Sequence, residues 1–149
     1  MARAHREREL AVRIGNQPGD LARLLSTITG AGVNILAYCA YSERDEGVVQ
    51  LVTENPVRTK IALEANGYGC RMNDVVLVRA ADQMGAAAIL GTHLGQAGVN
   101  IIYSYASSTG DNFHAVFKTN NDEEALRVLA DVALPAPPPA SGHRNRQLN

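Results

Sequence analysis

The sequence predicts an α+β protein made of two βαββαβ units, whose antiparallel sheets lie side by side with the helices of each unit on one face. Three observations support this prediction: an internal repeat, the same order of apolar patterns in both copies, and turn-forming residues between the patterns. The chain has 149 residues, of which 46% are hydrophobic, and this suits one globular unit or two very small ones.

The internal repeat has an offset of 66 residues. Residues 16–35 read NQPGDLARLLSTITGAGVNI and residues 82–101 read DQMGAAAILGTHLGQAGVNI, with nine of the twenty positions identical. Further identical pairs keep the offset as far as Leu63 and Leu129. A constant offset over such a length indicates two copies of one supersecondary unit.

The first half of copy one predicts a strand, a helix and a second strand. Residues 10–14 alternate apolar and polar side chains, as strands do. After the break at Pro18-Gly19, the leucines and isoleucine at 21, 24, 25 and 28 form one apolar stripe of a helix. Glycines at 30 and 32 end that helix, and residues 33–42 are a long β-prone stretch.

The second half of copy one predicts a hairpin, a helix and a last strand. The RDEG sequence at 44–47 is a turn that leads into a strand over 48–53. Asn55-Pro56 is an N-cap followed by proline at the first helical position, so a helix runs from there to about residue 65. A short strand follows at 68–72.

The second copy repeats this order, with strands at 75–79, 99–107 and 112–118 and a helix over 84–97. Asn121 caps another helix with Glu124 in its first turn, a reciprocal capping arrangement. The final strand is expected at 134–139. Because the sequence there is LPAPPPA and proline cannot donate to a sheet ladder, that strand must be short, at an edge, or missing.

These patterns divide the chain into a first domain at 8–73, a second at 74–134 and a Pro-rich, disordered tail at 135–149. A βαββαβ unit has one natural arrangement, an antiparallel sheet with both helices on one face, which is a ferredoxin-like sandwich. The bare sheet faces would be covered by a second chain, so we expect a homodimer.

Two motifs in each copy resemble the ACT domain, a ligand-binding regulatory module. They are N-x-P-G-D-L before the first helix and G-V-N-I on the next strand, and the second copy has the weaker D-Q-M-G-A with the same G-V-N-I. NDVVLV and YSYAS are also similar to stand-alone tandem ACT proteins. The resemblance covers roughly residues 8–132. It implies that an amino acid or similar metabolite binds between the paired domains.

The residues alone also favour a binding site at the turn before each long helix. Gly19 and Gly85 leave backbone unshielded where a helix begins, and the free N–H groups there suit a ligand carboxylate. Asn34 and Asn100 begin the next strand, which we expect near the same end of the sheet, and an amide can hold both the ammonium and the carboxylate. Asp20 could pair with the ammonium.

Each of these residues also has a purely structural interpretation. Gly19 could simply make the turn, and Asp20 could complement the helix dipole. Asn34 and Asn100 could satisfy loop backbone. Alternation along the strands places Cys39, Tyr103 and Tyr105 on the helix-covered face.

The two turns differ in a way that suggests different roles. Small residues replace Asp20 and Leu21 in the second copy and would leave room for a ligand side chain, while the first turn supplies polar contacts. The expected binding residues are Gly19, Asp20, Leu21, Asn34, Met84, Gly85, Ala86, Ala87, Asn100 and Ile101.

We expect no catalytic residues, no metal and no cofactor, so the chain is interpreted as a protein that is not an enzyme. The four histidines lack metal-ligand spacing, and no nucleophile or phosphate-binding motif is present. A net charge of −1 argues against nucleic-acid or membrane partners, and two cysteines without a signal peptide favour a cytoplasmic protein.

The sequence therefore favours an amino-acid-binding regulatory or sensor protein that acts on a partner enzyme or transporter. The alternative is a non-catalytic regulatory or assembly subunit of a partner enzyme, in which any ligand is secondary. A small enzyme on the same frame is a third, disfavoured possibility.

Overall fold

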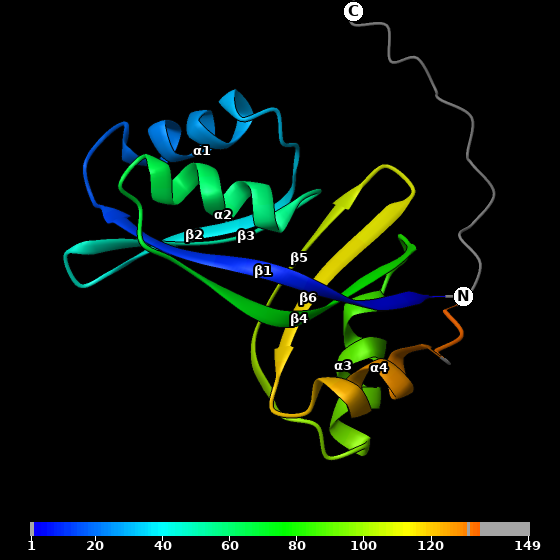
Figure 1. The fold of residues 1–149 in the computed structure, drawn as a ribbon. Coiled ribbons are helices and arrows are strands. Elements are labelled where there is room, and N and C mark those ends of the chain that lie inside the picture. The colour runs from blue at the N-terminus through cyan, green and yellow to red at the C-terminus, as the bar shows by residue number, and fades with distance from the viewer. Residues whose placement is uncertain (1, 131, 135–149) are drawn as a thin grey trace, which may run out of the picture. The chain divides into compact units, whose positions relative to one another are not determined.

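The computed structural model describes residues 2–130 and 132–134 (Figure 1). Contacts between residues divide the chain into two compact units. The first unit is Arg6–Val76, and the second combines the first five residues with the chain from Leu77 onward. Both units are ferredoxin-like, as the sequence predicts.

The first unit contains two helices on one face of a four-stranded sheet (Figure 1). The strand order is β2-β3-β1-β4, and β3 pairs antiparallel with both β1 and β2. The elements are β1 (Arg3–Gly15), α1 (Asp20–Gly30), β2 (Ile35–Glu43), β3 (Glu46–Thr53), α2 (Pro56–Ala65) and β4 (Cys70–Ala81).

The core of the first unit forms where the apolar side of β1 and β3 meets the apolar stripes of the helices. Val12 lies opposite Val49 in the sheet and Leu10 lies opposite Leu51, so one face carries a continuous apolar surface. Helix residues, Ile28 among them, bury that surface. The buried cluster is Leu10, Val12, Leu24, Ile28, Val33, Val49, Leu51 and Leu63.

The second unit repeats this core at the same offset as the sequence. Every member of the first cluster has a buried counterpart 66 residues later: Val76, the last residue of the first unit, and then Val78, Leu90, Leu94, Val99, Ala115, Phe117 and Leu129 in the second unit. Its elements after β4 are α3 (Ala86–Gln96), β5 (Ile101–Thr109), β6 (Asn112–Thr119) and α4 (Asp122–Ala130). The same positions are therefore buried in both copies, although some side chains differ in size, as Val49 and Ala115 do.

The N-terminus supplies the fourth strand of the second unit. The order there is β1-β4-β6-β5, and the part of β1 that belongs to this unit is Arg3–His5. The backbone N–H of Ala2 donates to the carbonyl of Val132 at 3.4 Å, and Ala2 is buried. Residues 132–134 form no strand. The rest of the expected last strand, and the tail at 135–149, lie outside the described residues.

The outer strands contain a β-bulge that the sequence analysis missed. The pairing of β2 with β3 shifts between Ile35 and Ala37, and that of β5 with β6 shifts between Ile101 and Tyr103. One extra residue moves all later side chains to the other face. Tyr103, Tyr105 and Cys39 were predicted on the helix-covered face, and this prediction is wrong. They lie opposite Lys118, Val116 and Gln50, whose side chains point away from the helices.

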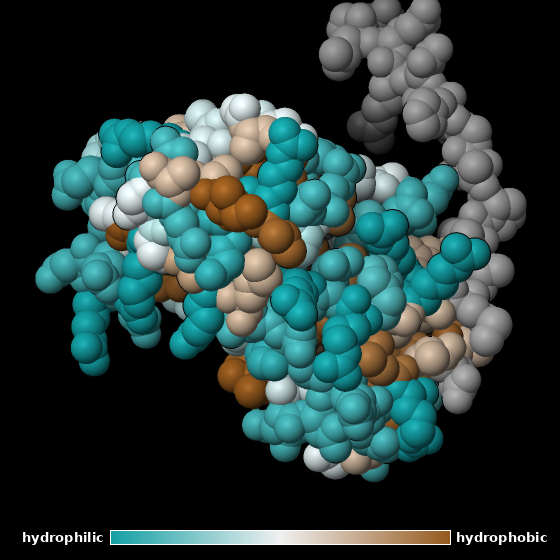
Figure 2. All heavy atoms as spheres, in the orientation of Figure 1, coloured by the Kyte–Doolittle hydropathy of each residue, from teal (hydrophilic) through white to brown (hydrophobic). Residues whose placement is uncertain are grey.

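Surface hydrophobic side chains occur over α2 on the face shown in Figure 2. The exposed apolar residues of that helix are Val57 and Ile61, one turn apart. Among the described residues, no helix is long and apolar enough to cross a membrane.

Candidate functional site

The turns before α1 and α3 have almost the same backbone conformation. Gly19 has φ 92° and Gly85 has φ 88°, both in the left-handed region that other residues adopt at a cost. Nothing lies within 4 Å of a Cβ built at either position. The backbone angle therefore explains both glycines, whether or not a ligand binds.

Each turn presents helix N–H groups that have no partner among the described residues. The N–H of Asp20 donates to Gln17 and that of Arg23 donates to Gly19, which leaves those of Leu21 and Ala22. The second turn follows the same pattern and leaves those of Ala87 and Ala88. Two free N–H groups at a helix N-terminus suit an anionic oxygen such as a carboxylate.

Asp20 has a structural role in the first turn. Its carboxylate accepts hydrogen bonds from the backbone N–H of Gln17 at 3.1 Å and from Arg23 at 2.9 Å. The same carboxylate packs so closely on Gly15 that it leaves no room for a Cβ there. Asp20 therefore braces the turn and already has a cationic partner. This geometry favours the structural interpretation of Asp20 over pairing with a ligand ammonium.

The second turn carries no such carboxylate. Ala86 is buried, Ala87 is exposed, and Met84 is fully exposed. The side-chain nitrogen of Gln83 is buried without a hydrogen-bond partner among the described residues. Leaving an amide donor buried and unsatisfied costs about 1–3 kcal/mol. The sequence analysis did not select Gln83, although its match to Gln17 in the repeat was a signal.

Asn34 and Asn100 lie far from the turns of their own units, contrary to the prediction. Gly15 pairs with Glu46 at one end of the first sheet, whereas Ile35 pairs with Thr53 at the other. β2 has nine residues, so the two ends are separated by roughly 27 Å. The prediction treated β2 as if it began where β1 ends, but the helix between them returns the chain to the opposite end.

The two asparagines differ in how their side chains are used. The Asn34 amide donates to Glu54 at 3.3 Å. The side chain of Asn100 has no partner among the described residues, and only its backbone bonds to Asn120. Ile101, the next residue, is half-buried and begins the bulged strand. Asn100 is therefore the better placed of the two to contact a ligand.

A hollow of about 200 Å³ lies beside the first turn. Leu21 lines it, together with Gly15, Ser42 and Gly47. The Ser42 hydroxyl donates to Asn16 at 2.9 Å, and in the second unit the Ser108 hydroxyl donates to Asp82 at 3.0 Å. Both copies thus fasten the end of the outer strand to the turn by the same contact.

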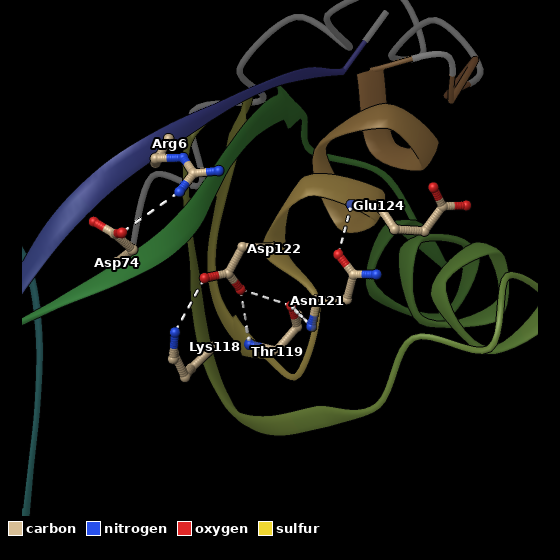
Figure 3. A network of polar contacts seen from close by, with 7 residues as sticks. All are labelled: Arg6, Asp74, Lys118, Thr119, Asn121, Asp122 and Glu124. Atoms are coloured by element: carbon tan, nitrogen blue, oxygen red, sulfur yellow. Dashed lines mark hydrogen bonds and ion pairs between the residues drawn. The ribbon is translucent and has the colours of Figure 1, made fainter.

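The start of α4 is a polar network with its own electrostatics (Figure 3). Burial raises the pKa of the Asp122 carboxyl, but hydrogen bonds from Thr119 at 2.6 Å and Lys118 at 3.0 Å outweigh it and hold that pKa below its usual value. The N–H of Glu124 donates to the Asn121 side chain, which confirms the predicted cap. The Glu124 carboxylate accepts from Arg127, so the reciprocal half of the predicted arrangement is replaced.

Neither metal ligation nor a reactive thiol is indicated in the part of the chain that the structure describes. No group of three His, Cys, Asp or Glu side chains there could hold a metal ion. Burial and then the nearby Glu64 carboxylate raise the pKa of the Cys70 thiol, which disfavours the thiolate.

A family model of the ACT domain pair matches residues 6–135. A search of curated proteins finds no match to this chain.

Three solved structures share the fold. Protein BT0572 from Bacteroides thetaiotaomicron has a TM-score of 0.78 and 24% identity, over 85% of this chain and 88% of that one. The ligand-free regulatory subunit of aspartate kinase from Thermus thermophilus has a TM-score of 0.66 and 15% identity, over 86% of this chain and 93% of that one. The corresponding subunit from Thermus flavus has a TM-score of 0.60 and 16% identity, over 86% of this chain and 94% of that one.

Proposed function

Because this chain belongs to the ACT domain pair family, we propose that it is a non-catalytic regulatory protein that binds an amino acid. The family supports a ligand-binding regulatory role, and the choice of an amino acid comes from the chemistry of the candidate site. The candidate site offers helix N–H groups that can donate to the carboxylate of an amino acid, and a side-chain amide whose oxygen can accept from its ammonium group.

The observation that carries the proposal is the turn before α3. The backbone N–H groups of Ala87 and Ala88 have no partner among the described residues, and the same turn contains Gln83, whose side-chain nitrogen is buried without a partner there. All three are donors, and Ala86 brings no competing charge. A bound carboxylate would supply the acceptor that these groups lack.

The first turn is a weaker anion site for an electrostatic reason. The carboxylate of Asp20 already lies against its backbone, so a ligand carboxylate would meet a like charge. We therefore assign the ligand carboxylate to the second turn and only packing contacts, through Leu21, to the first. This reverses the division of roles expected from the sequence.

An asparagine can join such a site only from another copy of the repeat. Within one unit the turn and the strand-start asparagine are roughly 27 Å apart, far more than one amino acid spans. A ligand that contacts both must bridge two copies, in one chain or in two. Such bridging stabilises the bridged state by the difference in affinity, and a partner protein would read that state.

The test is thermal unfolding of the full chain with each common amino acid at millimolar concentration. A ligand of the folded state adds about 2.7 kcal/mol of stability at a hundredfold excess over its Kd. We expect one amino acid, or one chemical group of them, to raise the midpoint. If none does, the amino-acid proposal is wrong.

Variants locate the site without disturbing the fold. Ala87→Glu adds a carboxylate at an exposed first-turn position, where it favours the helix dipole but repels a ligand carboxylate. We expect it to weaken binding about tenfold or more. Thr92→Glu adds the same charge farther along α3 and should leave binding unchanged. Asn100→Ala removes a side chain that has no partner among the described residues, and it should weaken binding as well.

We also propose that the chain forms a homodimer. The exposed side chains of Val57 and Ile61 are apolar surface that a second copy could bury. Light scattering with and without the bound amino acid should give twice the mass of the chain, and Ile61→Glu should lower it. A monomer under both conditions would exclude the dimer.

The second candidate function is a non-catalytic regulatory or assembly subunit of a partner enzyme, in which any ligand is secondary. The likeness to a regulatory subunit of aspartate kinase, over most of both chains, supports this candidate because it is an example of the same fold used as a separate regulatory subunit. Such a subunit should copurify with one partner at fixed stoichiometry, with or without ligand. Failure to recover a reproducible partner would leave the stand-alone sensor.

A further inference from the structure

The second unit has a basic hollow on its sheet that the proposed amino-acid site does not use. Its volume is about 420 Å³. The lining residues are Arg3, Arg79, Ala80, Ala81, Asn112 and His114. Two guanidinium groups, an imidazole and an amide thus surround it, and no carboxylate does.

The hollow lies on the face of the sheet away from the helices. In the repeat, His114 corresponds to Val48 and Arg79 corresponds to Arg13. In the first unit, Val48 and Arg13 pair with each other, on the face of the sheet opposite the buried cluster. Alternation along the strand gives His114 and Arg79 the same face in the second unit.

The first unit contains a hollow around the counterpart arginine, Arg13, in which the charge of that side chain is neutralised, although Arg71 also lines this hollow. Arg13 lines it and forms ion pairs with Glu46 at 2.7 Å and Glu43 at 3.6 Å. The counterparts of those two acids are Asn112 and Thr109. The second copy therefore keeps the arginine and has lost both of its anionic partners.

The arginines of the second hollow have no other anion. Among the described residues, the side chains of Arg3 and Arg79 form no hydrogen bond and no ion pair. Two carboxylates lie next to these strands in sequence, Asp82 after β4 and Asp111 before β6, but neither lines the hollow, and Asp82 accepts from Ser108. Two arginines around one hollow without an acid form a site of excess positive charge.

We propose that this hollow binds the phosphate group of a small phosphorylated metabolite. Arg3 and Arg79 supply planar forks of N–H donors that match a phosphate geometrically, and Asn112 and His114 add donors from β6. The volume of about 420 Å³ holds a phosphate with part of the group that carries it. The chain would thus sense a second ligand, separate from the amino acid.

The first test is calorimetric titration of the full chain with inorganic phosphate, at an ionic strength held constant with sodium chloride. We expect saturable binding of one phosphate per chain at millimolar concentration. Arg79→Gln should weaken it about tenfold, whereas Arg13→Gln, the matched substitution in the first unit, should change it less than about twofold.

Two exchanges between the copies sharpen the test. Asn112→Glu gives Arg79 the partner that Arg13 has and should abolish phosphate binding. The double variant Glu43→Thr with Glu46→Asn frees Arg13 and should create a second phosphate site, which would raise the stoichiometry.

Three results would overturn the proposal. They are no saturable binding, equal weakening by Arg79→Gln and Arg13→Gln, and binding that survives Asn112→Glu. The last would place the phosphate elsewhere, such as at a helix N-terminus. None of these results depends on the amino-acid midpoint shift, so the two proposals fail separately.

Discussion

The left-handed backbone conformation of Gly85 leads to a prediction about stability that does not depend on any ligand. Because its φ is 88°, Gly85→Ala forces a side chain into the left-handed region and should lower the free energy of unfolding by about 1–2 kcal/mol. Chemical denaturation without amino acids measures this. Gly19→Ala should show a similar loss, since its φ is 92°.

A glycine inside the same helix is the matched control. Gly91 lies within α3, where a Cβ would meet nothing within 4 Å. Gly91→Ala should therefore stabilise the protein by about 0.5–1 kcal/mol, because alanine loses less conformational entropy in a helix. Equal effects at positions 85 and 91 would show that the left-handed angle is not what requires glycine.

At the residue scale, the sequence could indicate which positions matter but not which contacts they make. Matching glycines in both copies located the turns. Asp20 was ambiguous, since a carboxylate in a first helical turn suits either the dipole or a ligand, and only its hydrogen bonds with Gln17 and Arg23 in the structure resolve this. The unpartnered nitrogen of Gln83 depends on burial, which no local pattern encodes.

At the scale of an element, the first turn of α4 should contribute to the free energy of unfolding in a way that depends on pH. Asp122→Asn loses the ion pair with Lys118 and a charge favourable to the helix dipole, and should cost about 1 kcal/mol at neutral pH. The folded state holds the pKa of Asp122 below its ordinary 3.8. Its contribution is therefore complete above that pH and is lost as the pH falls below it.

Denaturation at several pH values checks the contribution of Asp122. The difference between wild type and Asp122→Asn should be largest near neutrality and should disappear in strong acid. Glu124→Gln, at a more exposed ion pair with Arg127, should have a smaller effect. A difference that persists unchanged into acid would mean that the charge of Asp122 is not what stabilises α4.

The elements themselves were predictable because each has a local signal. Helix α1 has an apolar stripe, α2 and α4 have asparagine N-caps, and the turns have glycine or proline. The bulges at Ile35 and Ile101 were not predictable, because one inserted residue preserves composition and β-propensity while reversing the faces. For the same reason the sequence placed Cys39, Tyr103 and Tyr105 wrongly.

At the scale of the whole molecule, the repeat predicted the core but not the closure of the second sheet. The counterparts of all eight clustered core residues are buried. The proline-rich sequence after α4 signalled that the last strand was in doubt. Nothing local indicated that Arg3–His5, which precede the first copy, would belong to the second unit, because strand pairing over such a separation depends on tertiary structure.

The N-terminus should therefore stabilise the part of the protein that is most distant in sequence. Deleting residues 2–5 removes the outer β1 segment of the second unit and the contact of Ala2 with Val132. We expect a loss of about 1–3 kcal/mol in the second unit from the lost backbone hydrogen bonds and apolar burial. Hydrogen exchange should show faster exchange at residues 77–81 and in β6, with α1, β2 and β3 little changed. Arg3→Gln is the control, because it keeps the strand while removing the charge, and its exchange pattern should match the wild type. Faster exchange spread equally over both units would mean that these residues support the whole chain, and no change would mean that the second sheet closes without them.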